Sequence, residues 1–221
     1  MRIVALVPMK HNSVRVPGKN FRDFAGQPLF YYIIESLLGC PLISEVVVNT
    51  DSLHIRRDLA TDFPTVRILQ RPVELCGDKV SMNDILLYDT SQIEADFYLQ
   101  THSTNPLLRT DTITESIDSF LKNYPRYDSL FSVTKFQKRL WDKYGSPVNH
   151  DPSVLICTQD LAPLYEENSC IYIFTGNNLK ERGTRIGLSP WMFEIDTEEA
   201  FDIDTMSDFK IAELLYLNNA R

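Results

Sequence analysis

The residues that follow the first apolar run of the chain are of the types that bind phosphate. Cations and small polar side chains are grouped there around a Pro-Gly turn, and the polar members are Lys10, Ser13, Arg15, Lys19 and Asn20. Cationic side chains and free backbone amides both face anions favourably, so together they can surround a polyphosphate. A basic surface turn between a strand and a helix has the same composition, and the residue types alone leave both interpretations open.

Two familiar nucleotide motifs do not occur in the sequence. A P-loop would need glycine in place of Ser13 and serine or threonine in place of Asn20. No Gly-x-Gly-x-x-Gly segment follows any predicted strand. These differences disfavour a P-loop kinase and a dinucleotide-dependent enzyme.

Two carboxylates near the end of the chain have the spacing of a metal site. Asp202 and Asp204 flank Ile203, and in an extended segment residues two apart point to the same side. With phosphate oxygens, these carboxylates would form the hard oxygen ligand set that Mg²⁺ prefers. The alternative is a solvated acidic turn before the last helix, with Thr205 or Ser207 as the helix cap.

Other polar residues stand at or just after the ends of predicted strands. Arg71 and Gln100 are placed on the side of the sheet where a ligand is expected. His102, in the loop after Gln100, could act as a general base or be a hydrogen-bonding bystander. Asp51 is interpreted as a helix cap rather than as a ligand.

The composition is that of a globular chain without the marks of a nucleic-acid or membrane partner. Of its 221 residues, 43% are hydrophobic, and 22 Lys and Arg against 30 Asp and Glu give a net charge of −8. No apolar run approaches the length of a membrane span. The first predicted strand begins at Arg2, so we expect no secretory signal. The four cysteines form no Cys-x-x-Cys pair, so we expect reduced thiols in a cytoplasmic protein and no zinc site.

Apolar runs and helical segments alternate over the first part of the chain. Buried strands are predicted at 3–7, 45–50, 66–69, 97–100 and 129–134. Helices are predicted at 28–38, 51–61, 81–94 and 111–123. This alternation predicts a three-layer α/β fold with a mostly parallel sheet, and a ligand at the carboxyl ends of the strands.

The alternation weakens after Lys135. The segment from about Gln137 to Arg185 is aromatic and irregular, with strand pieces expected at 141–147 and 170–175. We interpret it as an insertion or small subdomain within a single domain spanning residues 1–221. A last strand at 191–195 and a helix at 207–218 are predicted to close the chain.

Several segments together resemble one enzyme family. The loop at 8–20 is similar to the signature of the sialic-acid and Kdo cytidylyltransferases (the acylneuraminate cytidylyltransferase family), which ends in Pro-Gly-Lys-Asn. Further similar segments follow in order at 24–29, 46–52, 71–75, 99–100, 106–110, 168–173 and 201–205. The resemblance implies a Rossmann-like nucleotidyltransferase fold with a dimerisation insertion at about 137–185.

The family's residue roles carry over position by position. The resemblance implies that Lys10, Arg15 and Lys19 face the CTP phosphates and act in catalysis. It also implies that Ser13, Asn20 and Arg71 bind the nucleotide, that Gln100 faces the sugar, and that Asp202 and Asp204 hold one or two Mg²⁺ ions.

The implied reaction transfers CMP from CTP to the anomeric hydroxyl of an acidic 2-keto-3-deoxy sugar and releases pyrophosphate. The enzyme is expected to be a homodimer. Lys10 replaces the family's usual arginine and Val14 a common lysine. Two alternatives therefore stay open: a nucleotidyltransferase for another acceptor, such as a sugar phosphate or phosphonate, and a non-catalytic nucleotide-binding relative. The sequence assigns no general base and does not name the sugar.

Overall fold

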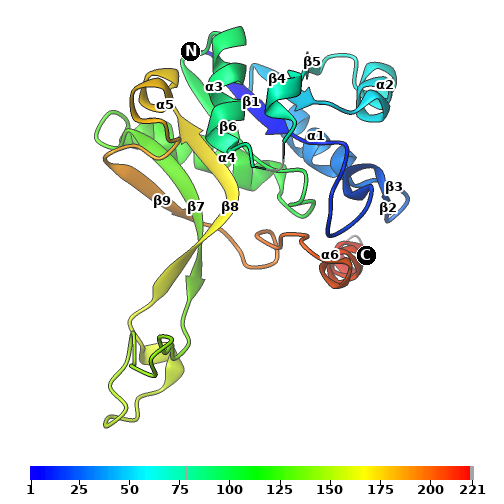
Figure 1. Ribbon diagram of the computed structural model, residues 1–221. Coiled ribbons are helices and arrows are strands. Elements are labelled where there is room, and N and C mark those ends of the chain that lie inside the picture. The colour runs from blue at the N-terminus through cyan, green and yellow to red at the C-terminus, as the bar shows by residue number, and fades with distance from the viewer. Residues whose placement is uncertain (78, 220–221) are drawn as a thin grey trace.

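A seven-stranded sheet runs through the protein, and helices cover both of its faces (Figure 1). The computed structural model describes residues 1–77 and 79–219. The strand order is β5 (Arg67–Gln70), β4 (Glu45–Thr50), β1 (Ile3–Pro8), β6 (Phe97–Gln100), β8 (Leu164–Phe174), β7 (Ser129–Phe136) and β9 (Pro190–Glu194). The first four strands in this order are parallel, β8 is antiparallel to both of its neighbours, and β7 is parallel to β9. The predicted three-layer, mostly parallel fold is confirmed.

The helices form the two outer layers. They are α1 (Leu29–Gly39), α2 (Leu53–Asp62), α3 (Met82–Gln92), α4 (Thr110–Asn123), α5 (Gly176–Arg182) and α6 (Met206–Asn219). Residues of β1 alternate between two hydrophobic clusters, because successive side chains of a strand point to opposite faces. Ala5 packs with α1 and α4 in one cluster, whereas Leu6 packs with α3 and α5 in the other.

Local sequence signals set the helix starts. The Ser52 hydroxyl accepts a hydrogen bond from the Ile55 amide at 3.3 Å and caps α2. Ser81 and Asp84 form a reciprocal capping box at the start of α3. Of the Asp51-Ser52 pair predicted to cap this helix, Ser52 is confirmed and Asp51 is wrong, because the Asp51 carboxylate accepts from the His11 amide at 2.7 Å.

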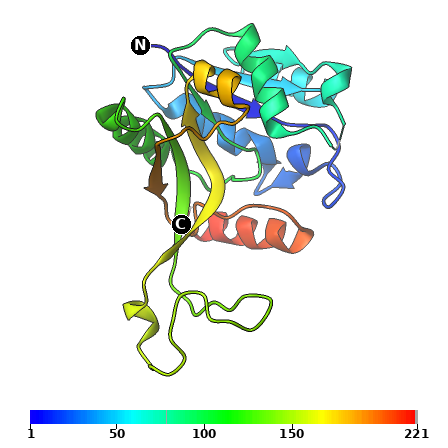
Figure 2. The ribbon, with the colours of Figure 1, turned by 60° about the vertical axis from the view of Figure 1, so that its left-hand side comes forward.

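The structure divides the insertion predicted at 137–185. Residues 137–163, which we call the arm, leave the sheet between β7 and β8 and protrude from the body (Figures 1 and 2). The rest of that range belongs to the body, because β8 pairs with both β6 and β7 and is followed by α5. Within the arm, the expected strand at 141–147 is reduced to one bridge between Trp141 and Pro147, and a 3₁₀ turn, η3, spans Thr158–Asp160.

The last helix brings the end of the chain back to the loop that follows β1. Phe209 and Ala212 of α6 pack with Phe24 and Tyr32, next to a small hairpin of β2 (Asp23–Phe24) and β3 (Gln27–Pro28). Residues 201–205 thereby reach the carboxyl edge of the sheet. Within the described residues, every helix is too short or too polar to span a lipid bilayer.

Candidate functional site

A cavity of about 410 Å³ lies at the carboxyl ends of the parallel strands. All six residues predicted to bind a nucleotide line it, namely Lys10, Ser13, Arg15, Lys19, Asn20 and Arg71. A second wall is largely apolar and consists of Gly77, Val80, Met82 and Ile85. The cavity therefore combines a cationic side, suited to phosphates, with an apolar side, suited to a flat ring.

The conformation of the loop after β1 is fixed by a glycine turn and by hydrogen bonds of Asn20. Gly18 has a φ of +67°, and the 3₁₀ turn η1 (Lys19–Phe21) follows it. A Cβ atom at Gly18 would lie 2.8 Å from the Phe21 ring, so glycine is needed here both for the backbone conformation and for space. The Asn20 amide donates to the Lys10 carbonyl and accepts from the Ser103 hydroxyl, both at 2.8 Å. These bonds tie the two ends of the loop to each other and to the loop after β6.

Lys19 is a buried cation between the loop and the end of the chain. Its side chain is only 9% exposed, and its Nζ donates to the Ile203 carbonyl at 2.5 Å. Burial lowers the pKa of Lys19, while the charges of Asp202 and Asp204 oppose that shift. The ammonium group is thus held at the cavity wall beside two carboxylates.

Arg15 bridges the cavity and the aspartate pair. Its two terminal nitrogens bind the two Asp204 carboxylate oxygens at 2.6 and 2.7 Å. The pair is largely exposed, so it adds little to folding stability. Its consequence is positional, because it holds a guanidinium group at the rim of the cavity.

Asp202 and Asp204 lie as their spacing predicts. Ile203 between them is fully buried, and the charges of both carboxylates act on Lys19, so the two lie near the same cation. Loss of surrounding water raises the pKa of Asp202, although the residue remains accessible from solvent, and a hydrogen bond with Thr104 opposes the shift.

The aspartate pair does not cap α6. The Thr205 hydroxyl accepts from the Asp208 amide at 3.2 Å, and the Asp208 carboxylate accepts from the Thr205 amide at 2.7 Å. Thr205 and Asp208 therefore form the cap without the aspartate pair. Both Asp204 oxygens are bound by Arg15, so a cation at Asp204 would have to share or replace that contact. In the described part of the chain, no group of three acidic, His or Cys side chains could hold a metal, so a cation here would also need phosphate or water oxygens. That donor set suits Mg²⁺, which usually keeps several waters and binds through one or two carboxylates.

Arg71 is held in place by Asn49 and, through it, by Asp89, neither of which was predicted from the sequence as a site residue. Its Nε and Nη2 donate to the Asn49 side-chain and backbone oxygens at 2.7 and 3.1 Å. The Asn49 amide in turn donates to Asp89 of α3 at 2.5 Å. Burial raises the pKa of Asp89 to about 6. The sequence did contain a signal for Asp89: it lies at helical spacing from Ile85 and Leu86, so an acidic residue was to be expected on the buried face of α3.

Gln100 and His102 lie behind the cavity and at its wall, respectively. Gln100 is fully buried, is not among the residues lining the cavity, and donates to the Thr101 carbonyl at 2.8 Å. Its Nε2 also lies 3.1 Å from His102 Nε2. Burial, with smaller contributions from Arg185 and Lys19, lowers the pKa of His102 to about 4. A neutral His102 whose Nε2 faces an amide donor fits the bystander interpretation better than a general base.

A parallel sheet with a cationic cavity at its carboxyl edge defines a nucleotide-binding α/β protein. Comparison with known proteins then gives the family. A family model described as cytidylyltransferase matches residues 4–220, and the chain belongs to this family. The resemblance found in the sequence is therefore confirmed.

Similar proteins cover the whole length of the chain. It is 25% identical over 232 residues to the pseudaminic acid cytidylyltransferase of Campylobacter jejuni subsp. jejuni, covering 99% of this chain and 98% of that one. It is 28% identical over 230 residues to the CMP-N,N'-diacetyllegionaminic acid synthase of Legionella pneumophila, covering 97% and 96%. Among solved structures, a CMP:2-keto-3-deoxy-manno-octonic acid synthetase complexed with CTP has a TM-score of 0.78 at 17% identity, covering 99% and 100%. At that identity the likeness concerns the fold.

Proposed function

We propose that this protein transfers CMP from CTP to the anomeric hydroxyl of an acidic 2-keto-3-deoxy sugar, a nonulosonate, and releases pyrophosphate. One observation carries the proposal: in a chain of the cytidylyltransferase family, the predicted phosphate-binding residues line one cavity, and an aspartate pair lies beside two of them, Arg15 and Lys19. The curated relatives named after pseudaminic and legionaminic acid support the acceptor class.

The residues around the cavity would have two roles in the reaction, stabilisation of charge and orientation of the nucleotide. The sugar hydroxyl would attack the α-phosphorus in line with the departing pyrophosphate, a step that depends mainly on positioning and charge stabilisation. Lys10, Arg15 and Lys19 would stabilise the charge that grows on the leaving group. Ser13, Asn20 and Arg71 would orient the nucleotide, with its base against the apolar wall.

Asp202 and Asp204 would hold one or two Mg²⁺ ions. A bound Mg²⁺ would supply neutralisation of phosphate charge and activation of the attacking hydroxyl. Both carboxylates lie beside Lys19 and Arg15, so the chain presents hard anionic ligands directly next to its phosphate-binding cations. Thr104 would orient the carboxylate of Asp202.

We also infer a cytoplasmic homodimer in which the arm contributes the contacts. Large apolar side chains of the arm are uncovered in the single chain: Leu155 is 92% exposed and Tyr144 80%. Exposed apolar surface concentrated on one segment is typical of a protein interface. Free thiols at Cys40, Cys76, Cys157 and Cys170 are consistent with a reducing compartment.

A screen of pyrophosphate release with Mg²⁺ tests the proposal. Nonulosonic acids, a 3-deoxyoctulosonate, sugar phosphates and phosphonates would each be offered with CTP, UTP, ATP or GTP, with acceptor-free reactions as controls. We expect turnover with CTP and a nonulosonic acid. Comparable turnover with UTP or ATP would contradict the cytidylyl assignment. Turnover confined to sugar phosphates or phosphonates would identify the alternative acceptor class, and CTP binding without turnover a non-catalytic relative.

A further inference from the structure

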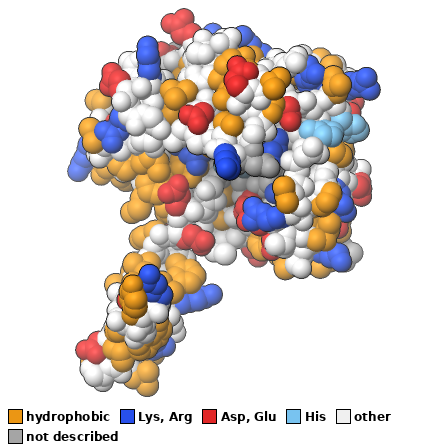
Figure 3. Space-filling model, viewed as in Figure 1, with side chains coloured by type: hydrophobic (Ala, Val, Ile, Leu, Met, Phe, Trp, Pro, Cys, Tyr) orange, Lys and Arg blue, Asp and Glu red, His pale blue; other side chains and the backbone are white. Residues whose placement is uncertain are grey.

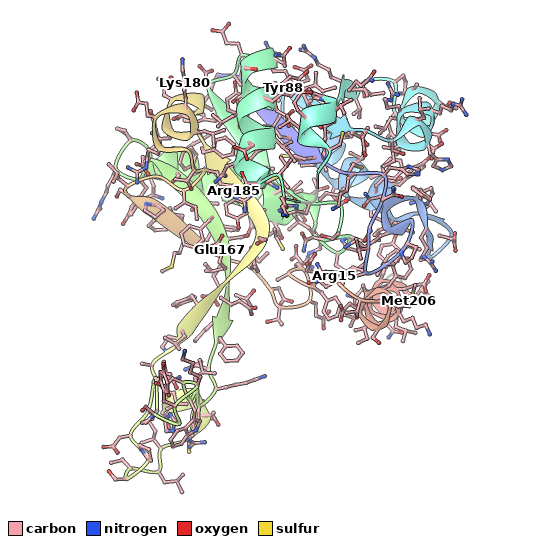
Figure 4. The ribbon with its side chains drawn as sticks, in the orientation of Figure 1. Arg15, Tyr88, Glu167, Lys180, Arg185 and Met206 are labelled. Atoms are coloured by element: carbon pink, nitrogen blue, oxygen red, sulfur yellow. The ribbon has the colours of Figure 1, made fainter. Side chains whose placement is uncertain are left out.

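Arg185 is a cation beside the cavity to which no role has been assigned. It lies between α5 and β9, is half-buried, and occupies the same face of the molecule as Arg15 (Figure 4). Figure 3 shows this face hollowed near its centre, with Lys and Arg side chains beside the hollow. Among the described residues, no carboxylate lies within ion-pair distance of Arg185. Its charge is therefore available to a ligand.

The guanidinium group of Arg185 is held flat. Its central carbon lies 3.5 Å from the centroid of the Tyr172 ring, and Nη1 donates to Gln100 Oε1 at 2.5 Å. Tyr172 is fully buried, and its hydroxyl donates to Glu167 at 2.5 Å. One of the five guanidinium N–H donors is thus engaged in the described structure, and a planar, pre-oriented fork is the geometry that binds carboxylates in a bidentate manner.

A local irregularity of the sheet supports this arrangement. The register between β7 and β8 shifts between Phe131 and Val133, and Ser169 on β8 has a φ of +61°. The Ser132 hydroxyl accepts from the Ile171 amide at 2.8 Å within the bulge. Bulges re-aim neighbouring side chains, and this one lies between Glu167 and Tyr172, the residue whose ring lies under Arg185.

Gln100 is not free to bind a sugar in this arrangement. Its oxygen accepts from Arg185, and its amide nitrogen donates to the Thr101 carbonyl and faces His102. Both ends of the side chain are engaged with protein groups. The resemblance assigned sugar binding to Gln100. In this arrangement Gln100 would act on the sugar indirectly, by orienting Arg185.

Arg185 lies close to the cavity without lining it. His102 lines the cavity, and it experiences the charges of both Arg185 and Lys19. Gln100, which accepts from Arg185, has its amide nitrogen 3.1 Å from His102 Nε2, so Arg185 lies on the His102 side of the cavity. An acceptor that reaches the α-phosphate from that side would meet the guanidinium group.

We propose that Arg185 binds the carboxylate of the acceptor sugar and makes the enzyme select acidic acceptors, with Tyr172 and Gln100 as positioning residues. The proposal rests on the cytidylyl transfer proposed above and specifies how its acceptor is recognised. It predicts a defect confined to the acceptor, because the nucleotide is bound by other residues.

The test compares Arg185→Gln and Arg185→Lys with wild type, using a nonulosonic acid and its C1 carboxamide as acceptors. Arg182→Gln, the same change at an exposed position at the end of α5, is the matched control. Pyrophosphate release would be measured against acceptor at saturating CTP, and against CTP at saturating acceptor. We expect Arg185→Gln to lower kcat/KM for the acid by about 10- to 100-fold, as for a lost hydrogen bond to a charged group, with an unchanged KM for CTP.

The two acceptors separate charge recognition from a structural role. Wild type should prefer the acid to the carboxamide, and Arg185→Gln should lose that preference while Arg185→Lys keeps part of it. An unchanged acid preference in Arg185→Gln, or equal losses for CTP and acceptor, would overturn the proposal for Arg185. Wild type that is inactive with both sugars but active with an uncharged or phosphorylated acceptor would instead overturn the proposed function.

Discussion

The cavity and the arm differ in how the protein holds their side chains. At the cavity, Lys19, Asn20 and Arg71 are charged or polar yet at most 9% exposed, and each is hydrogen-bonded to another segment of the chain. In the arm, Leu155 and Tyr144 are apolar yet almost fully exposed. The cavity buries polar groups together with their hydrogen-bond partners, whereas the arm exposes apolar side chains, which are ordinarily buried.

The contrast separates two kinds of function. Buried polar groups with fixed partners are costly to rearrange, so we expect the cavity to keep its arrangement within one chain. An exposed apolar segment reaches its stable environment only against another surface. Substitutions at the cavity should therefore affect turnover at any protein concentration, whereas substitutions in the arm should act through association.

The largest effect is expected from the aspartate pair. Asp202→Asn and Asp204→Asn keep the side-chain shape but remove the charge that binds a hard cation. We expect each to lower kcat by about 1,000-fold, since a metal contributes several kcal/mol of transition-state stabilisation, and excess Mg²⁺ to restore only part of the rate. The measurement is pyrophosphate release as a function of Mg²⁺ concentration.

Asp208→Ala is the control for this prediction. Asp208 completes the cap of α6, so its loss should lower the melting temperature by removing a capping interaction of about 1 kcal/mol. Its Mg²⁺ requirement should stay that of wild type. An unchanged metal requirement in both Asp202→Asn and Asp204→Asn would return that pair to the role of a solvated turn.

Lys19→Ala should have the next largest effect. Removing a cation directed at a developing phosphate charge should cost about 2–4 kcal/mol of transition-state stabilisation, as with other preorganised donors. The lost bond to the Ile203 carbonyl should also lower stability slightly. Lys180→Ala, an exposed lysine of α5, is the matched control (Figure 4). Activity of Lys19→Ala within a fewfold of wild type would place Lys19 outside the catalytic machinery.

Local patterns in the sequence were sufficient to predict most helices and strands and to select residues that line one cavity. Buried apolar runs gave the strands, and capping residues such as Ser81 gave helix starts. The predicted cations line one cavity because they come from a single loop and from the carboxyl ends of parallel strands, which share one edge of the sheet. Spacing alone was also sufficient to predict that Ile203, between Asp202 and Asp204, is buried.

Long-range pairing accounts for what the sequence did not predict. The predicted insertion extended too far, because its second half contains β8, which belongs to the central sheet. The partners of β8 lie far away in the chain, and its bulge interrupts the alternation of inward and outward side chains. Arg185 and Asp89 were missed for a related reason. Each acts through a residue distant in sequence, Gln100 in one case and Asn49 in the other.

Asp89 offers a smaller and pH-dependent test of the buried cavity network. Burial raises its pKa from the ordinary value of 3.8 to about 6, so the folded protein binds a proton between pH 4 and 6 more readily than the unfolded chain does. Stability should therefore fall as pH rises through that window. Asp89→Asn retains the acceptor for Asn49 but removes the buried charge.

We expect Asp89→Asn to exceed wild type in free energy of unfolding by about 3 kcal/mol at pH 7, and the difference to disappear toward pH 4. Urea denaturation at a series of pH values measures it. Asp84→Asn on the exposed N-terminal turn of the same helix is the control and should show no such rise. Identical pH profiles for wild type and Asp89→Asn would mean that Asp89 is not ionised in a buried environment.

The smallest effect is expected from the arm, and it should appear in association rather than in nucleotide binding. Leu155→Ser removes an apolar side chain that would be buried in a dimer. Covering a leucine is worth about 1.5–3 kcal/mol, so the dimer dissociation constant should rise by at least about tenfold. Sedimentation over a range of concentrations measures that constant, and calorimetric titration measures CTP affinity, which should not change because the arm is separate from the cavity. Ile211→Ser on α6, 45% exposed and outside the arm, is the matched control and should leave both constants unaltered. A concentration-independent monomer would exclude the dimer, and a loss of CTP affinity in Leu155→Ser would show that the arm belongs to the nucleotide site and that the two regions are not separate.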